Sequence, residues 1–600
     1  MMASTDTTEA TDTALEEMLR DEVSLERLDR HLRHFATLFR DSGTEDERRA
    51  AAYVAERVAE YGLETEILEV DGYLSWPGAA TLRLLSDGAG TEIPVRTRAF
   101  GAPTPPAGLE AELVFVPSAA PAKGEMIFGH RAIAADYGER DVVGKVVLTA
   151  DGGPDGVGRA QERGALAHVH VWPSNEPVIH EMIATSVWGT PTPDSATRVP
   201  RIPALGVTHG DGERLREQAE RGPVRVRLAA EVRTGWAPMP LVVADLPGKE
   251  ETFLLVGAHI DSWYEGITDN ATGDAALIEM ARALGRHRGM LRHGVRFAWW
   301  PGHSTGRYAG STWFADTRFA ELRERCLGYL NIDSPGVRDT AIWDCRYNTG
   351  EVEHVTRNVV RELSGQEPNI RRPLKAADQS FLGVGLPSLG AFRMLPLDHP
   401  DRKAVGGCGG GWWWHTPADT LDKVDPQILA EDTRVYLTMT ARMCRPDAHP
   451  YDFVPVADDF VAHLDAYAEA GDGRLDLAPA RERALAFRAA AVRLRETVPA
   501  AVPSSNGETA RRNAGLRRLS RILNPALFTV GGPYEFDPAL QLPVLPGLAP
   551  VRELPALDPA SDNHRFLRTH LLRQRNRIED ALVQATELAG ELADSGDGGS

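Results

Sequence analysis

Histidine and aspartate residues follow three short apolar runs of the sequence, and these residue types bind divalent cations. The run "ETFLLVGAHID" ends with His259 and Asp261, "GVRFAWWPGH" ends with His303, and "CLGYLNID" ends with Asp333. Near-continuous apolar runs of this length are typical of buried strands in a parallel sheet. Because parallel strands place their carboxyl ends at one edge of the sheet, the sequence predicts that these side chains meet there.

Two further residues of the same types are expected near that edge. Asp269, in "TDNATG", opens the helix predicted after the first run, and His415, in "WWWHTPADT", follows a glycine-rich loop. A single His or Asp at a strand end is more often a cap or a satisfied polar group, but a group of them at one sheet edge favours a metal site. A carboxylate that bridges two cations roughly 3.5–4 Å apart would help to polarise an amide carbonyl and to lower the pKa of a bound water to about 7.

The segments around these residues resemble the metal-binding blocks of a known family. "VGAHIDSW", "TDNATGDAALIEMARAL", "NID" and "HTPADTLDKVD" are similar to blocks of the co-catalytic zinc exopeptidases, which include bacterial aminopeptidases, glutamate carboxypeptidase II and the transferrin receptor. The resemblance implies that His259 and Asp333 hold one metal, that Asp269 bridges, and that His415 holds the second metal. It also implies that Asp261 orients His259. Zinc is the expected metal, with two divalent ions, and cobalt, manganese and iron are alternatives.

The turn after the second run departs from that family. The family has a Glu-Glu pair there, of which the first is the general base and the second a ligand of the second metal. Here His303 and Ser304 stand at these positions, and no glutamate lies between Arg296 and Asp316. His303 can be a metal ligand, which we favour, or a proton shuttle. Glu265, in "SWYEGITDN", is then the candidate general base.

The same turn suggests an alternative nucleophile and a substrate contact. "GHSTG" matches the Gly-x-Ser-x-Gly pattern of serine hydrolases, which would make Ser304 the nucleophile. That hypothesis leaves the metal-ligand pattern unexplained, and no His-Gly-Gly-Gly segment precedes the turn. Arg307 and Tyr308, in "GRYAGS", are candidates for binding a substrate carboxylate or oxyanion, and Trp414 for shaping an apolar pocket.

The elements that would position these residues indicate an α/β fold with two additions. We expect a mostly parallel central sheet flanked by helices, formed by residues 26–105 and 236–450. Residues 106–235 resemble the β-rich protease-associated insert domain of the family, and residues 451–595 resemble its helical dimerisation domain. Residues 1–25 are predicted to be a disordered tail. The resemblance implies a homodimer.

Composition excludes several other classes of function. The net charge of −20 argues against binding to nucleic acid. No apolar run reaches the roughly 18 residues that a membrane-spanning helix needs, so no membrane partner is expected. The four cysteines lack Cys-x-x-Cys spacing, and the acidic start has no signal-peptide pattern, so we expect a reduced cytoplasmic protein.

Together these observations predict a metal-dependent hydrolase of amide bonds. We expect an exopeptidase or an amidohydrolase that acts on a small peptide or an N-acyl amino acid. A non-catalytic binding or scaffold protein of the same fold is the alternative, because the Glu-Glu pair is missing.

Overall fold

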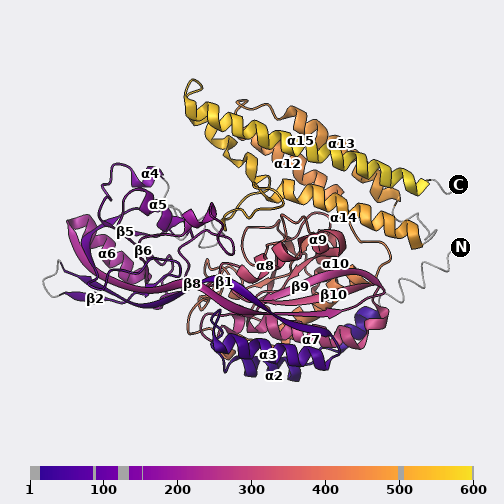
Figure 1. Cartoon of the computed structure of the whole chain (residues 1–600), viewed down its shortest axis with the longest axis horizontal. Coiled ribbons are helices and arrows are strands. Elements are labelled where there is room, and N and C mark those ends of the chain that lie inside the picture. Colours follow the sequence, from indigo (N-terminus) through magenta and orange to yellow (C-terminus); the bar gives the residue numbers. More distant parts are fainter. Residues whose placement is uncertain (1–13, 86–89, 119–133, 152, 498–505, 598–600) are drawn as a thin grey trace.

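A computed structural model of the chain describes residues 14–85, 90–118, 134–151, 153–497 and 506–597. Figure 1 shows three parts: a β-rich lobe on the left, a central sheet with helices on both faces, and a bundle of long helices along the top. The ribbon formed by β1 (Glu64–Leu84) and β8 (Val224–Leu246) runs from the central sheet into the left lobe.

Parallel strands form the part of the sheet that positions the predicted ligands. Their order is β14-β11-β9-β10, and β8 continues the sheet antiparallel to β10. The strands are β9 (Glu250–His259), β10 (His293–Trp300), β11 (Cys326–Asn331) and β14 (Ser388–Leu389). In the register, Trp300 pairs with His259 and Asn331 with Gly257, so the carboxyl ends of β10, β9 and β11 lie side by side. The predicted mostly parallel sheet is confirmed.

Side chains of the central strands alternate between two cores. Along β9, Leu254, Val256 and Ala258 belong to one core, and Phe253 and Leu255 belong to the other. Helices on the first side are α2 (Leu25–Phe35), α3 (Glu45–Glu60), α7 (Thr272–Arg286), α10 (Glu353–Ser364) and α11 (Pro426–Cys444). The short helices α8 (Ala309–Thr317) and α9 (Phe319–Arg325) cover the second side.

The predicted disordered tail is wrong for the residues that the structure describes. Residues 14–21 are helical, and Leu15 and Leu19 are fully buried in the first core. Glu16 also pairs with Arg442 of α11, at 2.9 Å. Leu15 and Leu19 are four positions apart, so they lie on one face of the helix and bury together. Residues 1–13 lie outside the described part of the chain.

The insert begins earlier than predicted. β1 is continuous across the boundary, with a register shift between Pro77 and Ala80, and beyond that shift Leu82 and Leu84 belong to the core of the insert. The expected start at residue 106 is therefore too late, because one long strand serves both parts. Its strands and helices are β2 (Thr91–Ile93), β3 (Arg96–Thr97), β4 (Leu109–Phe115), α4 (Ala134–Tyr137), β5 (Val146–Thr149), α5 (Gly156–Glu162), β6 (Ala167–Val171), β7 (Ala204–Val207) and α6 (His209–Arg221).

The C-terminal region is helical, as predicted. It contains α12 (Val454–Ala470), α13 (Ala478–Thr497), α14 (Asn506–Phe528) and α15 (Asp562–Asp597). Arg521 of α14 donates to the backbone oxygens of Leu322 and Gly385, which joins the bundle to the α/β part. A small separate sheet pairs β12 (Ile342–Cys345) with β13 (Asn369–Ile370) and β15 (Arg393–Met394).

Two composition-based expectations concern described residues. Within the described ranges, every helix is too short or too polar to span a bilayer. All four cysteines are free and buried.

Candidate metal centre

Three of the predicted ligands converge at the carboxyl edge of the sheet. His259 is the last residue of β9, Asp269 lies in the turn at Ile267–Ala271 before α7, and Asp333 follows β11. Their ligand atoms lie within 4.8 Å of one another. Nε2 of His259 is 3.1 Å from Oδ1 of Asp269. Within the described ranges these residues form a metal-ligand set of one imidazole and two carboxylates.

The electrostatics of this group favour a cation. Burial lowers the pKa of His259, but its hydrogen bond to Asp269 and the nearby carboxylates outweigh this and raise the pKa well above its usual value. Burial and the charge of Asp269 both raise the pKa of Asp333. A divalent cation would remove the repulsion between the two carboxylates, so the donor set fits a metal such as zinc.

Contacts from two neighbouring loops fix the backbone around Asp269. Oδ1 of Asp419 accepts hydrogen bonds from both the amide and the hydroxyl of Thr268. Nδ2 of Asn270 donates to the backbone oxygen of Ile332 at 3.0 Å, and Oδ1 of Asn270 accepts from the amide of Ser334 at 2.9 Å. The turn that presents Asp269 is thus tied to the loop that presents Asp333. Both supporting side chains lie in the quoted motifs, but nothing in the sequence indicates their partners.

Asp261 contacts His259 through its backbone, while its carboxylate has other partners. The backbone oxygen of Asp261 accepts from Nδ1 of His259 at 2.9 Å, while its carboxylate oxygen Oδ1 is 3.8 Å from that nitrogen. The carboxylate instead accepts hydrogen bonds from the amides of His303 and Ser304, both at 3.0 Å, and from the hydroxyl of Ser42. Asp261 therefore orients His259 through its backbone and holds the turn after β10 through its side chain.

His415 reaches the same bridging carboxylate from a separate loop. Its Nε2 is 3.3 Å from Oδ2 of Asp269, and its Nδ1 bonds the backbone oxygen of Glu181 at 2.9 Å. The amide of Glu181 donates to the backbone oxygen of His415, and Nδ1 of His180 bonds that of Trp414. The insert thus positions His415, a role that no motif in the insert predicted.

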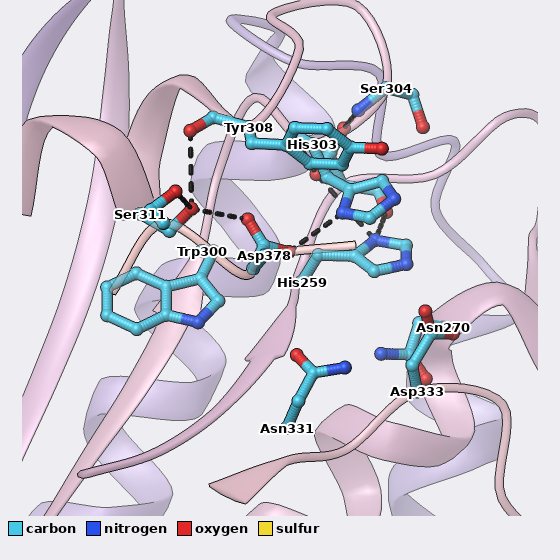
Figure 2. A network of polar contacts seen from close by, with 12 residues as sticks. His259, Asn270, Trp300, His303, Ser304, Tyr308, Ser311, Asn331, Asp333 and Asp378 are labelled. Carbon is cyan, nitrogen blue, oxygen red and sulfur yellow. Dashed lines mark hydrogen bonds and ion pairs between the residues drawn. The ribbon is translucent and has the colours of Figure 1, made fainter. Parts of the chain in front are cut away.

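His303 is held by a carboxylate that lies far away in the sequence. Figure 2 shows its Nδ1 bonded to Oδ2 of Asp378, at 2.8 Å. Oδ1 of Asp378 accepts from the hydroxyl of Ser311 at 2.7 Å. The His303 ring stacks on that of His259, with centroids 3.8 Å apart. A carboxylate accepts hydrogen bonds and cannot donate them. Nδ1 of His303 is therefore the donor to Asp378, and Nε2 is the nitrogen left for the cavity.

The predicted second metal position is incomplete in the structure. Asp269 and His415 approach each other, but within the described ranges His303 does not join them in a set of three converging ligand atoms. The prediction that His303 is a metal ligand is therefore not supported by the geometry. Its imidazole faces Asp378 through one nitrogen, and among the described residues no carboxylate completes the second position in its place.

Two other candidates are not placed for catalysis. Glu265 is absent from the residues that line the cavity at the metal ligands, and its backbone oxygen accepts from Arg40 at 2.9 Å. Ser304 does line the cavity, but no imidazole among the described residues hydrogen-bonds its hydroxyl; His303 bonds Asp378 instead. The geometry of a Ser-His pair is thus missing, and the serine-hydrolase hypothesis loses its support.

The predicted substrate-binding residues share a cavity with the metal ligands. Arg307, Tyr308 and Trp414 all line it. The insert adds Pro154, Met182 and Ile183 to the wall. Arg307 and Tyr308 have φ values of 54° and 70°, a left-handed conformation that costs roughly 1–3 kcal/mol per residue and often marks functional sites.

Known proteins resemble this chain in sequence and in fold. Residues 242–440 match the family model described as "Peptidase family M28". Leucine aminopeptidase 2 of Trichophyton equinum is 28% identical over 267 residues, which cover 41% of this chain and 52% of that protein. The chain thus spans about half the length of this curated relative.

Solved structures extend the likeness in fold. An aminopeptidase from Aneurinibacillus sp. strain AM-1 has a TM-score of 0.55 and 20% identity, and the match covers 72% of this chain and 96% of that one. A zinc aminopeptidase from Bacillus subtilis has a TM-score of 0.55 and 18% identity, and the match covers 72% of this chain and 98% of that one.

Proposed function

We propose that the protein is a metal-dependent exopeptidase, on the premise that the match of residues 242–440 to peptidase family M28 makes its α/β domain a member of these co-catalytic zinc exopeptidases. The observation that supports the proposal most strongly is the convergence of His259, Asp269 and Asp333 within 4.8 Å. Their cavity also holds candidate substrate contacts, so binding and hydrolysis would take place together.

The family implies zinc, and the chain offers one complete set of ligands for it. The ion would be held by His259, Asp269 and Asp333. His415 lies next to the other carboxylate oxygen of Asp269, and these two groups would be the donors at the second position. Bound zinc polarises a carbonyl and lowers the pKa of water to about 7. Because the second position has only two converging donors, we propose one firmly held ion and a weaker second position.

We assign His303 the task of moving the proton, in place of the family's glutamate. Asp378 accepts the Nδ1 hydrogen and fixes the tautomer, so Nε2 of His303 can take a proton from the attacking water. The same nitrogen can then give the proton to the departing amine. Asp261 positions this imidazole by binding the backbone amide of His303.

A non-catalytic binding protein of the same fold is the second candidate. It is favoured by the replacement of the Glu-Glu pair by His303 and Ser304. The His303–Asp378 contact argues against it, because a turn without catalysis does not need an imidazole fixed by a buried carboxylate. Dimerisation through the helical region stays a prediction from the resemblance, and sedimentation velocity would test it.

Zinc loading and hydrolysis distinguish the two candidates. Purified protein is reconstituted with zinc, its metal content is measured by plasma mass spectrometry, and it is offered a panel of dipeptides, aminoacyl anilides and N-acyl amino acids. Hydrolysis that is lost with a chelator and restored by zinc supports the exopeptidase. Tight zinc binding without turnover of any member would contradict it and favour the binding protein.

A further inference from the structure

Arg307 is a buried cation in the wall of the cavity. Its side chain is 6% exposed, and its Nε has no hydrogen-bond partner among the described residues. Its guanidinium lies over the ring of Tyr308, 5.0 Å from the centroid, and forms no ion pair with a carboxylate of the described ranges. A buried guanidinium that lacks a carboxylate partner is costly, because the attraction of a counter-charge does not offset its desolvation. This position is therefore suited to an anion that comes from outside the chain.

The surroundings of Arg307 form a recess with a second cation. Arg307, Tyr308 and Lys375 line a smaller hollow together with Ala539 and Leu540 of the C-terminal region. Lys375 is also buried, and its contact with Asp537 is long, at 3.8 Å. The amide of Ala539 donates to Ser186 of the insert, which closes the recess between the two added domains.

The rings around the recess fix its shape. Trp188 of the insert packs against Tyr308, with centroids 4.4 Å apart, and lies 5.3 Å from Nζ of Lys375. The indole of Trp188 donates to the hydroxyl of Ser380 at 3.0 Å. Ser380 contacts Ser311, which bonds Asp378. The recess and the network that holds His303 thus share a wall.

Arg307 and the metal ligands line one cavity, so a small molecule can touch both. Resting on the proposed function, we propose that Arg307 binds a free carboxylate of the substrate, so that the enzyme prefers dipeptides or N-acyl amino acids with an unblocked C-terminal carboxylate. A planar guanidinium can bind a carboxylate through two parallel hydrogen bonds, which would place the amide bond in a fixed position. Long peptides and C-terminal amides would lack this contact.

Matched acid and amide substrates test the proposal. The zinc-loaded protein is compared on Leu-Gly, Leu-Gly amide and Leu-Glu amide, and an uncleavable Leu-Gly analogue with a reduced amide bond is used to measure binding by calorimetry, as acid and as amide. We expect kcat/KM and affinity to be about 10- to 100-fold higher for the acid, because a hydrogen-bonded charge pair is lost with the amide. Activity on Leu-Glu amide would show that a side-chain carboxylate can replace the terminal one.

Substitutions of Arg307 and Arg318, which flank α8 on its two sides, separate this role from general damage. Arg307→Gln is expected to abolish the preference for the acid, so that kcat/KM for Leu-Gly falls to about the value for Leu-Gly amide, while the zinc content stays the same. Arg307→Lys should recover part of the preference. Arg318→Gln, at the other end of α8 and 41% exposed, is the control and should keep the full preference.

The outcomes separate this inference from the proposed function. The inference is overturned if the acid and the amide are bound and cleaved equally. It is also overturned if Arg307→Gln lowers kcat/KM for the acid and the amide by the same factor, because Arg307 then does not recognise the carboxylate. If no substrate is cleaved but the acid analogue binds more tightly in an Arg307-dependent way, the carboxylate site is supported and the proposed exopeptidase function fails.

Discussion

The carboxyl ends of β9, β10 and β11 lie side by side, but the end of β10 differs in its chemistry from the other two. His259 and Asp333 stand at the first two ends and converge with Asp269 on one point. At the end of β10, His303 turns one nitrogen to Asp378 and stays outside that group. Under the proposed function, this fold keeps its metal ligands while the neighbouring strand end supplies a different proton carrier.

The two regions share one support. The backbone of Asp261 orients His259, and its carboxylate holds the amides of His303 and Ser304. Apart from this residue, the ligand set depends on Asn270 and Asp419, and His303 depends on Asp378 and Ser311. Substitutions in the two regions should therefore separate metal binding from proton transfer.

Asp269→Ala should have the largest effect. Asp269 contacts both His259 and His415, so its loss removes the centre of the ligand set. We expect zinc content to fall below about 0.2 per chain and activity to fall more than about 1,000-fold, since a metal-activated water is lost. Plasma mass spectrometry and initial rates measure this. Asp398→Ala, at an exposed position, is the control, and an Asp269→Ala protein with full zinc would refute the ligand set.

His303→Ala should separate the two regions most sharply. We expect activity to fall by about 100- to 10,000-fold, the usual contribution of a general acid-base group, with zinc content unchanged. Rates and metal content are measured on the same sample. Loss of zinc together with rate would show that His303 is a ligand, as its sequence position suggested.

Asp378→Asn should have a smaller effect in the same direction. The amide is uncharged and presents a donor as well as an acceptor, so it fixes the tautomer of His303 less well than the carboxylate does. Loss of such a supporting contact typically lowers activity by about 10- to 100-fold. Zinc content should stay constant. Thermal unfolding of the variant must be checked, because Asp378 is buried. Wild-type rates in a folded variant would contradict the proposal that Asp378 fixes the tautomer of His303.

Ser304→Ala should have the smallest effect. The hydroxyl of Ser304 has no imidazole partner within the described ranges, and its amide keeps the bond to Asp261. We expect rates within about 2-fold of wild type, because the substitution removes no hydrogen bond to an imidazole and keeps the backbone contact. A fluorophosphonate that labels Ser304 and abolishes activity would instead revive the serine-hydrolase hypothesis.

The sequence predicted the residues whose positions follow from strand patterns. His259 and Asp333 could be found because an apolar run places its end at a known edge of the sheet. Asp378 and Glu181 could not be assigned, because their contacts join loops that are far apart in the chain, at separations of 75 and 234 residues. The start of the insert was misplaced for a similar reason: β1 runs through the boundary without a turn signal.

Anomalous diffraction from a zinc-loaded crystal tests the central claim most directly. The account predicts a zinc peak bonded to His259, Asp269 and Asp333 at about 2.0–2.2 Å, with Nδ1 of His303 still bonded to Asp378. A peak bonded to Nε2 of His303 at that distance, or no peak among the three ligands, would contradict it.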